Sequence, residues 1–442
     1  MIAVGVTPHM EMDRVNGYRD VMVWDGITDA HSHFDGALLN HYPSNNPNRM
    51  NVEPNTVAYM VENINIQSAA LKRLEECSSK EGSQIDLFDK TKVTKIVRPL
   101  IEELHQHYVD GENKAVPKDK EVKAESPIDL EDWPSIHLDN GKTIKTRLLI
   151  GADGINSPVR DFAYIDSLGW DYDTHGVVAT LKLDPNRPNN TAWQRFLPSG
   201  PIALLPLSEE YASLVWSVKP HLAKALKNVS PADFCTLINA AYRLPHVDLQ
   251  YMYKQISSSP SPDMPSTTLQ DEYAWRENTA TKSLSDQSML DREYALPPQV
   301  IDVQENSRAS FPFRLRNAER YVADRVALVG DAAHSTHPLA GQGMNQGLLD
   351  VECLSKLLEK GTMEGQDIGN IHLLRKYPAE RYWRNILMLS SCDKIDRLFS
   401  NDIAPVTWIR SLGIKAVHNM DFLKAEIMKY AMGIEYSGDF RH

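Results

Sequence analysis

The segment 325–347, RVALVGDAAHSTHPLAGQGMNQG, contains the residue types and spacing best suited to chemistry in this chain. Residues 325–329 are mostly apolar and predict a short buried strand that ends at a Gly-Asp pair. Because α/β folds bind ligands at the carboxyl ends of parallel strands, the Asp331 carboxylate is placed to accept hydrogen bonds from sugar-like hydroxyls. Gly341 and Gly343 would let a flat ligand approach a helix start, where free N–H groups favour negative charge by about 0.3–1 kcal/mol. The segment therefore predicts a site for a flat ligand that carries or develops negative charge.

A helix should follow this loop and run to about Lys360, with Gly361 as its C-terminal stop. Its apolar residues recur at spacings of 3, 3 and 4, which puts them on one face: Leu348, Val351, Leu354 and Leu358. The periodicity predicts an amphipathic helix directly behind the loop.

A second strand end, residues 151–160 (GADGINSPVR), carries a related pattern. It follows an apolar run, 148–150, that is typical of a buried parallel strand. The Asp-Gly pair at 153–154 predicts a tight turn, and Ser157 and Arg160 follow at helical spacing. Such a turn is common and by itself is more often structural than functional. The two strand ends together are much more specific than either alone.

The patterns around these motifs predict a mixed α/β protein in which an antiparallel sheet domain is inserted into an α/β domain. Strand-like runs begin near residue 174 and a helix follows at 231–243, opened by Ser230 and Pro231. The other predicted elements are two strands within 18–35, a helix from Asn63 to Cys77, a strand over 86–97 and a hairpin over 136–150. Two stretches are predicted loops, the charged segment 111–132 and the Ser/Pro-rich segment 257–266.

Composition and charge exclude several classes of function. The 442 residues include 59 Asp and Glu against 47 Lys and Arg, and the formal net charge of −12 argues against nonspecific binding to nucleic acid. No run of 18 apolar residues occurs, which argues against a spanning helix but leaves a local peripheral membrane contact open. The four cysteines contain no CxxC pair and are expected as free thiols, and the pair His31 and His33 lacks further ligands, so no metal site is predicted. Residues 1–16 read as neither a signal peptide nor a transit peptide.

The two strand-end motifs together resemble those of the FAD-dependent aromatic hydroxylases, which have a p-hydroxybenzoate-hydroxylase-like fold. The resemblance is carried by Gly330-Asp331-Ala332-Ala333-His334, Pro338, Gly341-Gln342-Gly343-Met344-Asn345, and Gly151-Ala152-Asp153-Gly154 with Ser157 and Arg160. Further stretches are similar to the mitochondrial ubiquinone-biosynthesis monooxygenases, which hydroxylate the ring of a polyprenylated phenol: Val23-Trp24-Asp25, residues 192–196 and 200–206, Val215-Trp216-Ser217 and Phe311-Pro312. This similarity runs from about Tyr18 to Gly433.

The resemblance implies FAD as the cofactor and gives roles to residues of this chain. Asp331, after Gly330, would bind the ribityl chain, and Pro338 would line the flavin face where oxygen reacts. Backbone N–H groups near the pyrimidine edge of the isoalloxazine would come from Gly341, Gln342, Gly343, Met344 and Asn345. Asp153 and Gly154 would lie near the FAD pyrophosphate, and Asn63 or Gln67 of the early helix would touch the same region.

The resemblance also implies how the reaction is divided between cofactor and protein. The inserted sheet would wall a pocket for the substrate ring with Phe196, Pro201, Leu204, Trp216, Phe311 and Pro312. The family's chemistry proceeds through a flavin C4a-hydroperoxide, so the cofactor performs the difficult step while the protein orients the reactants. No side chain is therefore expected to act as a catalytic base.

Partners and location follow from the resemblance alone. It implies O2, electrons from ferredoxin and its reductase, other subunits of a ubiquinone-synthesis complex, and a peripheral position on the matrix side of the mitochondrial inner membrane. Two alternatives stay open: an NAD(P)H-dependent phenol hydroxylase of the same fold, and a catalytically inactive subunit with a scaffold role.

One departure from the family concerns the strand–GxGxxG–helix unit that holds the FAD pyrophosphate, which residues 1–60 do not supply. Losing its charge-assisted bonds would cost roughly 5–10 kcal/mol of FAD binding, and strand 325–329 would lose a neighbour. We therefore expect a truncated chain. The expected domains are an unmatched stretch 1–17, an incomplete FAD-binding domain over 18–170 and 308–370, a substrate-binding sheet domain over 171–307, and a C-terminal helical region over 371–442.

The C-terminal region carries a sustained apolar stripe at spacings of 3 and 4: Ile409, Leu412, Ala416, Met420, Leu423, Ile427 and Ala431. Lysines lie among its polar positions, so a helix that docks on a membrane surface or a partner is one reading. Packing of the stripe into the core is the favoured one.

Overall fold

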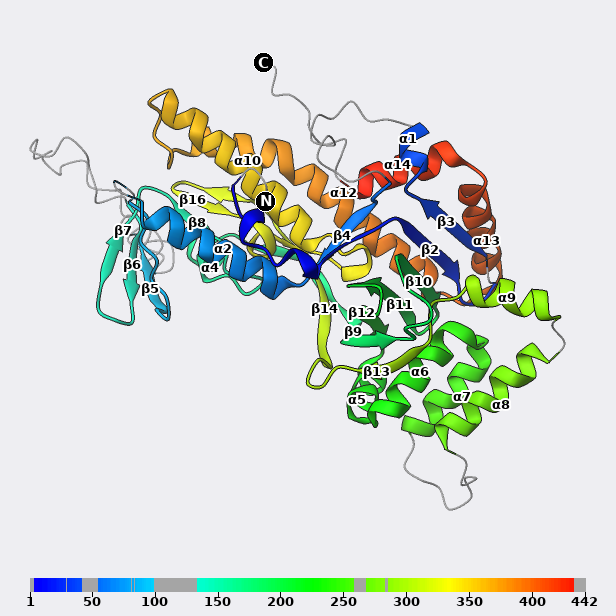
Figure 1. Ribbon diagram of the computed structural model, residues 1–442. Helices are drawn as coiled ribbons and strands as arrows, with labels where there is room; N and C mark the ends of the chain where they lie inside the picture. The colour runs from blue at the N-terminus through cyan, green and yellow to red at the C-terminus, as the bar shows by residue number, and fades with distance from the viewer. Residues whose placement is uncertain are drawn as a thin grey trace, which may run out of the picture. The chain divides into compact units, whose positions relative to one another are not determined.

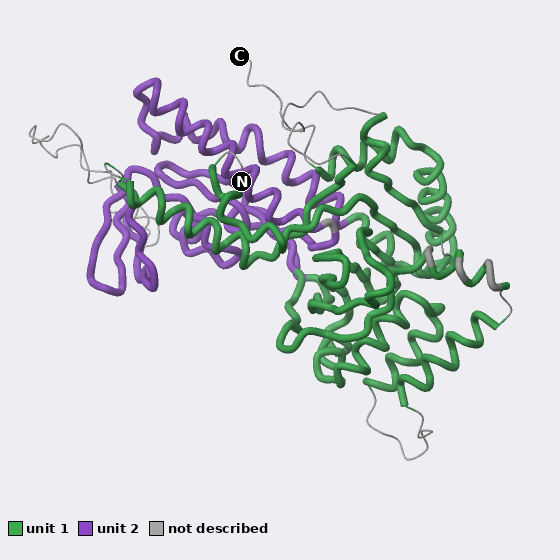
Figure 2. The backbone as a smooth tube through the Cα atoms, viewed as in Figure 1, with its two compact units in different colours: residues 1–85, 172–313, 394–442 green, residues 86–171, 314–393 purple. Residues whose placement is uncertain are grey.

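The computed structural model describes residues 4–28, 30–41, 55–80, 82, 84–98, 133–257, 268–282 and 285–432. The predicted loop 111–132 and nearly all of the predicted loop 257–266 lie outside these residues. The chain forms two compact units, each built from separate stretches of sequence (Figure 2). Unit 1 comprises residues 1–85, 172–313 and 394–442, and unit 2 comprises 86–171 and 314–393. Residues 18–85, expected with the FAD-binding domain, thus cluster with the sheet.

Unit 1 is organised by a mixed sheet with the strand order β9-β12-β11-β10-β2-β3 and with β13 paired to β9. Its strands are β2 (Asp20–Asp25), β3 (His31–Asp35), β9 (Ser167–Leu183), β10 (Thr191–Leu197), β11 (Gly200–Pro206), β12 (Tyr211–Val218) and β13 (Val300–Val303). The predicted antiparallel runs pair as expected, whereas β2 joins β10 in parallel, with Trp24 opposite Arg195. This pairing explains why the early residues belong to unit 1.

Helices α5 (Pro220–Asn228), α6 (Pro231–Arg243) and α7 (His246–Ser257) pack beside this sheet and close the main core of unit 1 (Figure 1). The predicted helix 231–243 is α6, and Ser230 caps it by accepting a hydrogen bond from the Asp233 N–H. Helices α8 (Leu269–Thr281) and α9 (Asp286–Tyr294) follow.

The remaining elements of unit 1 lie in its two terminal stretches. They are η1 (Thr7–His9), η2 (Met12–Arg14), β1 (Val15–Tyr18), α1 (Leu38–His41), β4 (Ala58–Val61), α2 (Asn63–Ser78), α13 (Ala404–His418) and α14 (Asp421–Ala431). The predicted helix from Asn63 is α2, but it buries Asn65 and Ala69, and its apolar Ile64 and Leu71 are exposed. Asn65 is inside because its amide exchanges two hydrogen bonds with the Glu11 backbone.

Unit 2 contains two small sheets, with strand orders β15-β16-β8 and β5-β6-β7. Their strands are β5 (Val93–Val97), β6 (Ser135–Leu138), β7 (Thr143–Lys145), β8 (Leu149–Gly151), β15 (Val322–Ala323) and β16 (Val326–Leu328). The rest of the unit is built by α4 (Pro158–Phe162), η4 (Gly330–Ala332), β17 (His334–Ser335), η5 (Pro338–Ala340), α10 (Gly343–Met363), α11 (Ile371–Leu374) and most of α12 (Lys376–Phe399), while β14 (Ala309–Ala318) runs from unit 1 into unit 2.

Three expectations about these elements are wrong. Strand β16 keeps a neighbour on each side, β15 and β8, and the edge of the described sheet is β8, where Ile150 is exposed rather than buried. Gly361 does not stop α10 but lies buried inside it, since a Cβ there would come within 2.5 Å of Leu373. The C-terminal stripe is divided between α13 and α14, and its larger residues point outward.

The state of the cysteines and the length of the described helices agree with what the composition predicts. Cys77, Cys235, Cys353 and Cys392 are all free thiols, as predicted. Within the described stretches of the chain, no helix is long and apolar enough to cross a bilayer.

Candidate functional site

The two predicted motifs follow neighbouring parallel strands of unit 2. β16 and β8 pair in parallel with Leu328 opposite Gly151, and the Val329 N–H donates to the Gly151 carbonyl at 3.0 Å. Both acidic turns therefore leave the same edge of the same small sheet. This is the edge at which α/β folds bind ligands.

The Gly330-Asp331 turn requires small residues. Gly330 has φ +58°, and a Cβ on Gly347 of α10 would lie 3.2 Å from the Gly330 Cα. The chain thus brings the start of α10 close beneath the turn. The Asp331 side chain remains exposed, and crowding by neighbouring atoms raises its pKa while nearby His334 opposes that rise.

The start of α10 presents open backbone. Gly341 has φ +60°, and no atom lies within 4 Å of the position that a Cβ would occupy. Among the described residues no side chain caps α10, and Met344 and Asn345 of its first turn are exposed. The N–H groups of that turn, with the helix dipole, favour an anionic group at this end.

The loop between these two features is shaped by His337. Its Nδ1 accepts a hydrogen bond from the Leu339 N–H at 3.2 Å, which caps η5 and fixes Pro338 at half-buried depth. Burial lowers the pKa of His337 to about 4, with a small opposing influence of Asp393. The imidazole is thus neutral at neutral pH, as an acceptor nitrogen must be.

The Asp153-Gly154 turn is held by hydrogen bonds to other residues of unit 2. Asp153 Oδ2 accepts from the Val159 N–H at 3.1 Å, so its carboxylate caps α4. Gly154 has φ +87°, with open space where a Cβ would lie. The Arg160 guanidinium donates to the Ala332 carbonyl at 3.1 Å and to the Ile155 carbonyl at 2.9 Å. One side chain therefore ties the two strand-end turns to each other.

Comparisons with known proteins agree with this geometry. The chain is 37% identical over 423 residues to ubiquinone biosynthesis monooxygenase COQ6 of Saccharomyces cerevisiae, covering 96% of this chain and 78% of that protein. It is 34% identical to human COQ6 over 430 residues, covering 97% and 78%. The chain belongs to the COQ6 family.

The family of FAD binding domains matches residues 273–385, which include the Gly330-Asp331 turn and α10. Solved structures share the fold. p-Nitrophenol 4-monooxygenase PnpA of Pseudomonas putida has a TM-score of 0.59 at 14% identity, covering 96% of this chain and 82% of that one. Klebsiella pneumoniae HpxO complexed with FAD and uric acid has a TM-score of 0.53 at 14% identity, covering 97% and 85%. The predicted mixed α/β fold of a flavoprotein monooxygenase is confirmed, and FAD is the cofactor of this class.

The described residues fit the FAD of a COQ6-family enzyme at the strand ends of unit 2. A flat ring system needs backbone without side chains above it, and Gly341 leaves that space. An exposed carboxylate at Asp331 suits ribityl hydroxyls, and the open first turn of α10 suits the electron-rich pyrimidine edge.

A buried polar network supports the turn of this COQ6-family chain, and sequence reasoning missed it. Asp350 of α10 is fully buried and accepts from the Gly330 N–H at 3.2 Å, from Arg381 Nε at 2.9 Å and from Asn385 Nδ2 at 3.1 Å. His334 Nε2 lies 2.5 Å from Asp350 Oδ2, the oxygen that also accepts from the Gly330 N–H, whereas Arg381 and Asn385 donate to Oδ1. Burial acts to raise the pKa of Asp350, but His334 and the Arg381 guanidinium outweigh it and lower that pKa. The network joins α10 and α12 to the loop that carries Asp331.

The residues predicted to wall the ring pocket fall on two faces of the sheet in unit 1. Leu204 and Trp216 are fully buried in the core that α5, α6 and α7 close. Strand alternation puts Phe196 and its partner Pro201 on the opposite face, where the Phe196 ring stacks on Phe399 at 4.0 Å. Leu204 and Trp216 therefore serve packing rather than an opening.

The remaining predicted pocket and cofactor residues lie on two other elements, β14 and α2. Phe311 and Pro312 are exposed on β14, with the Phe311 ring 5.8 Å from Phe313. Asn63 and Gln67 are exposed on the first two turns of α2 in unit 1.

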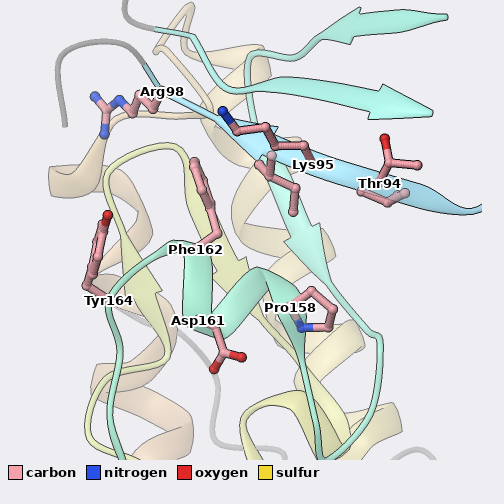
Figure 3. Close-up of a pocket in the computed structure, with 9 residues that line it drawn as sticks. Thr94, Lys95, Arg98, Pro158, Asp161, Phe162 and Tyr164 are labelled. Atoms are coloured by element: carbon pink, nitrogen blue, oxygen red, sulfur yellow. The ribbon is translucent and has the colours of Figure 1, made fainter. Parts of the chain in front are cut away.

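Unit 2 also has a cavity of about 260 Å³ between β5 and α4, the helix that starts at the Asp153 turn (Figure 3). Lys95, Phe162 and Tyr164 are among its lining residues. Arg98 at its rim is paired with Asp324 at 2.7 Å. The cavity contains none of the predicted site residues.

Proposed function

We propose that this chain is an FAD-dependent monooxygenase that hydroxylates the aromatic ring of a polyprenylated phenol in ubiquinone biosynthesis. The observation that carries the proposal is the pair of acidic turns at neighbouring strand ends, next to the open start of α10, in a chain of the COQ6 family.

The proposal gives each element at the strand ends a part in holding FAD. Asp331 would accept hydrogen bonds from the ribityl hydroxyls, and residues 341–345 would direct backbone N–H groups at the pyrimidine edge. Pro338 would lie against the flavin ring. Asp153, Gly154 and the α2 residues Asn63 and Gln67 would lie toward the pyrophosphate. Bound FAD would supply the activation of O2.

The substrate ring would be enclosed by apolar side chains rather than by a catalytic base. Exposed Phe311 and Pro312 present apolar surface for this, while Phe196 and Pro201 are buried on the sheet face opposite the helices and would support the wall from behind. A dry pocket would protect the reacting groups from water. Orientation and water exclusion are the protein's part in the reaction.

The proposed setting is the matrix face of the mitochondrial inner membrane, with ferredoxin and its reductase as electron donors and other ubiquinone-synthesis proteins as neighbours. The COQ6 relatives of Saccharomyces cerevisiae and human are named as mitochondrial, which supports the organelle. A donor of this kind distinguishes the proposal from an NAD(P)H-dependent hydroxylase of the same fold.

The test is reconstitution of the purified 442-residue chain with FAD. We expect a protein-bound flavin spectrum, flavin reduction by reduced ferredoxin faster than by NADPH, and transfer of one ¹⁸O atom from ¹⁸O2 to a prenylated phenol, detected by mass spectrometry. The Asp331→Ala variant should lose bound flavin, whereas Asp302→Ala, an exposed acidic residue of β13, should not. A folded chain that excess FAD cannot reconstitute would contradict the enzyme reading and favour an inactive subunit.

A further inference from the structure

Unit 1 contains a cavity of about 370 Å³, which we call the α5–α7 cavity and which none of the predicted site residues lines. Its walls come from the turn between β10 and β11, the residues around the start of α5, one side of α7, and residues 400 and 402. Its polar lining includes Ser199, Lys219, His221, His246, Tyr253 and Lys254. A cavity of this volume has room for a small molecule.

One face of α7 lines the cavity and another face enters the core. The lining residues of α7 recur at spacings of 4, 3, 1 and 3, which places them on one side of the helix: His246, Gln250, Tyr253, Lys254 and Ser257. Leu249 and Met252 are fully buried in the main core of unit 1. The polar face of α7 is therefore turned toward the cavity.

Two hydroxyl groups in the cavity wall are buried without a partner. Tyr253 is 8% exposed, and neither its hydroxyl nor that of Ser199 makes a hydrogen bond of normal geometry among the described residues. Burial raises the pKa of Tyr253, while the nearby Ser199 hydroxyl and the Arg195 guanidinium oppose that rise. Both hydroxyls keep their protons at neutral pH and can donate them. Buried polar groups are normally paired, so these two point to a partner from outside the chain.

His246 adds a third unpaired donor. Its Nε2 lies 2.8 Å from the amide nitrogen of Gln250, which can only donate, so Nε2 accepts and Nδ1 carries the ring proton. Nδ1 is buried and has no hydrogen-bond partner in the part of the chain that the structure describes. Burial and the Arg195 guanidinium lower the pKa of His246, against a smaller opposing influence of Asp402, so the ring is neutral at neutral pH.

The cavity also carries positive charge. Lys254 is exposed and makes no ion pair with any other described residue, whereas Lys219 pairs with Asp173 at 3.0 Å. Asp402 is the only acid among the lining residues, and it is exposed. No side chain of the described residues caps α5, so the N–H groups of its first turn, at His221, lack an acceptor within the helix.

We propose that the α5–α7 cavity binds a small phosphorylated molecule. The side chains that would hold its phosphate each have a proton to donate: Ser199, His246, Tyr253 and Lys254. A phosphate offers three acceptor oxygens in a tetrahedral arrangement, which suits several donors from different elements better than the two oxygens of a planar carboxylate. The uncapped start of α5 favours the same negative charge. The cavity belongs to unit 1, whereas the strand ends proposed for FAD belong to unit 2, so this ligand would be additional to the cofactor.

The test is isothermal titration calorimetry of the purified full chain with inorganic phosphate and with glycerol 3-phosphate, and with glycerol as the control ligand. We expect saturable binding of both phosphates and none of glycerol. Lys254→Ala should weaken binding by about tenfold or more, because it removes a charge-assisted hydrogen bond, and Tyr253→Phe by about fivefold. Since the Tyr253 hydroxyl has no partner in the chain, Tyr253→Phe should not lower the midpoint of urea unfolding, as loss of a structural hydrogen bond would.

Two variants outside the cavity are matched controls. Lys224→Ala removes an exposed lysine of α5, and Tyr251→Phe alters a tyrosine of α7 whose ring lies against Arg276. Both should bind phosphate as wild type does. The strand ends of unit 2 also favour anions, so the cavity variants, and not binding alone, decide the test.

Three results would overturn the proposal. They are a wild-type chain that binds neither phosphate, a Tyr253→Phe or Lys254→Ala chain that binds as tightly as wild type, and displacement of phosphate by phosphatidic acid vesicles but not by glycerol 3-phosphate. The first two leave the cavity to water, and the third assigns it to a lipid headgroup. Phosphate binding requires no flavin, so its failure is separable from failure of the proposed activity.

Discussion

Among the described residues, each unit contains one fully buried arginine–aspartate pair, and the two pairs are built in opposite ways. In unit 2 the carboxylate is the centre: Asp350 collects hydrogen bonds from Arg381, Asn385 and the Gly330 N–H, and contacts His334. In unit 1 the guanidinium is the centre: Arg410 donates to Asp25 and to the carbonyls of three residues, 398, 399 and 401.

The difference shows what each pair does for the molecule. The carboxylate centre lies on α10 and draws its donors from α12 and from the loop, so it fixes the turn that carries Asp331. The guanidinium centre gathers carbonyls at the end of α12 and a strand carboxylate, so it fixes the rotation of a helix. Buried pairs add little net stability over apolar packing, and these two are better understood as devices that specify geometry.

The largest expected effect is that of Asp350→Ala. It leaves Arg381 as a buried charge without its carboxylate, so unfolding should become easier by about 3–5 kcal/mol in urea titrations. Bound FAD should be lost with it, because the Gly330 N–H loses its acceptor. Glu352→Ala, an exposed acidic residue on the same helix, is the control and should change stability by less than about 0.5 kcal/mol. An Asp350→Ala protein as stable as the control would show that the network around Asp350 contributes little to the free energy of unfolding.

In unit 1 loss of the arginine, rather than of the aspartate, should have the larger effect on the free energy of unfolding. Arg410→Met removes the centre and leaves the buried Asp25 carboxylate with a hydrogen bond from the Ile27 N–H, at a cost of about 3 kcal/mol. Asp25→Asn should cost less, because Arg410 keeps its carbonyl acceptors. Urea titrations of both variants, with Lys415→Ala as an exposed control on the same helix, check the order. Equal costs, or a larger cost for Asp25→Asn, would remove the distinction between the two pairs.

The sequence was informative where function depends on neighbouring residues and uninformative where it depends on distant ones. The turns at Gly330-Asp331 and at residues 153–154 were predicted because each follows its own apolar strand run. The network was missed because Asp350 and Arg381 lie on different helices, and a charged residue on a helix reads as solvent-facing. One signal was available: Asp350 shares a helical face with buried Cys353 and Leu354 at spacings of 3 and 4.

The C-terminal stripe shows a second limit of the sequence. Its period of 3 and 4 correctly indicated helices with an apolar side, but periodicity reports which residues share a face and not what that face meets. The choice depended on Arg410 finding Asp25, 385 positions earlier in the chain, which no local pattern encodes. Core packing was therefore the wrong inference from a correct pattern.

His337 and Asp350 should affect the stability of the fold in different pH ranges. His337 has a folded pKa of about 4 against 6.5 in an exposed histidine, so between these values the unfolded chain binds more protons than the folded one. Stability should therefore fall as pH drops from 6.5 to 4, by up to about 3 kcal/mol from this residue. Asp350, whose pKa is lowered, loses its contribution only below about pH 4.

The check is urea unfolding at several pH values for wild type and His337→Asn, whose side-chain oxygen can still accept the Leu339 N–H. The variant should show a flatter profile between pH 6.5 and 4, whereas His372→Asn, a surface histidine of α11, should follow wild type. Parallel profiles for wild type and His337→Asn would place the acid sensitivity elsewhere in the chain.

The smallest effect expected is that of Arg160→Lys, which tests whether the two strand-end turns act as one site. The planar guanidinium spans the carbonyls of Ala332 and Ile155, and an ammonium on a shorter reach cannot serve both in that geometry. Losing one charge-assisted hydrogen bond should cost about 1–2 kcal/mol of stability. Because the freed Ala332 carbonyl belongs to the turn of Asp331, FAD affinity in fluorescence titrations should fall by up to about tenfold. Arg320→Lys is the matched control, since Arg320 is exposed and donates to the carbonyl of Tyr164, away from both turns. If Arg160→Lys lowers stability but leaves FAD affinity at the control value, the bridge supports unit 2 without coupling its two turns.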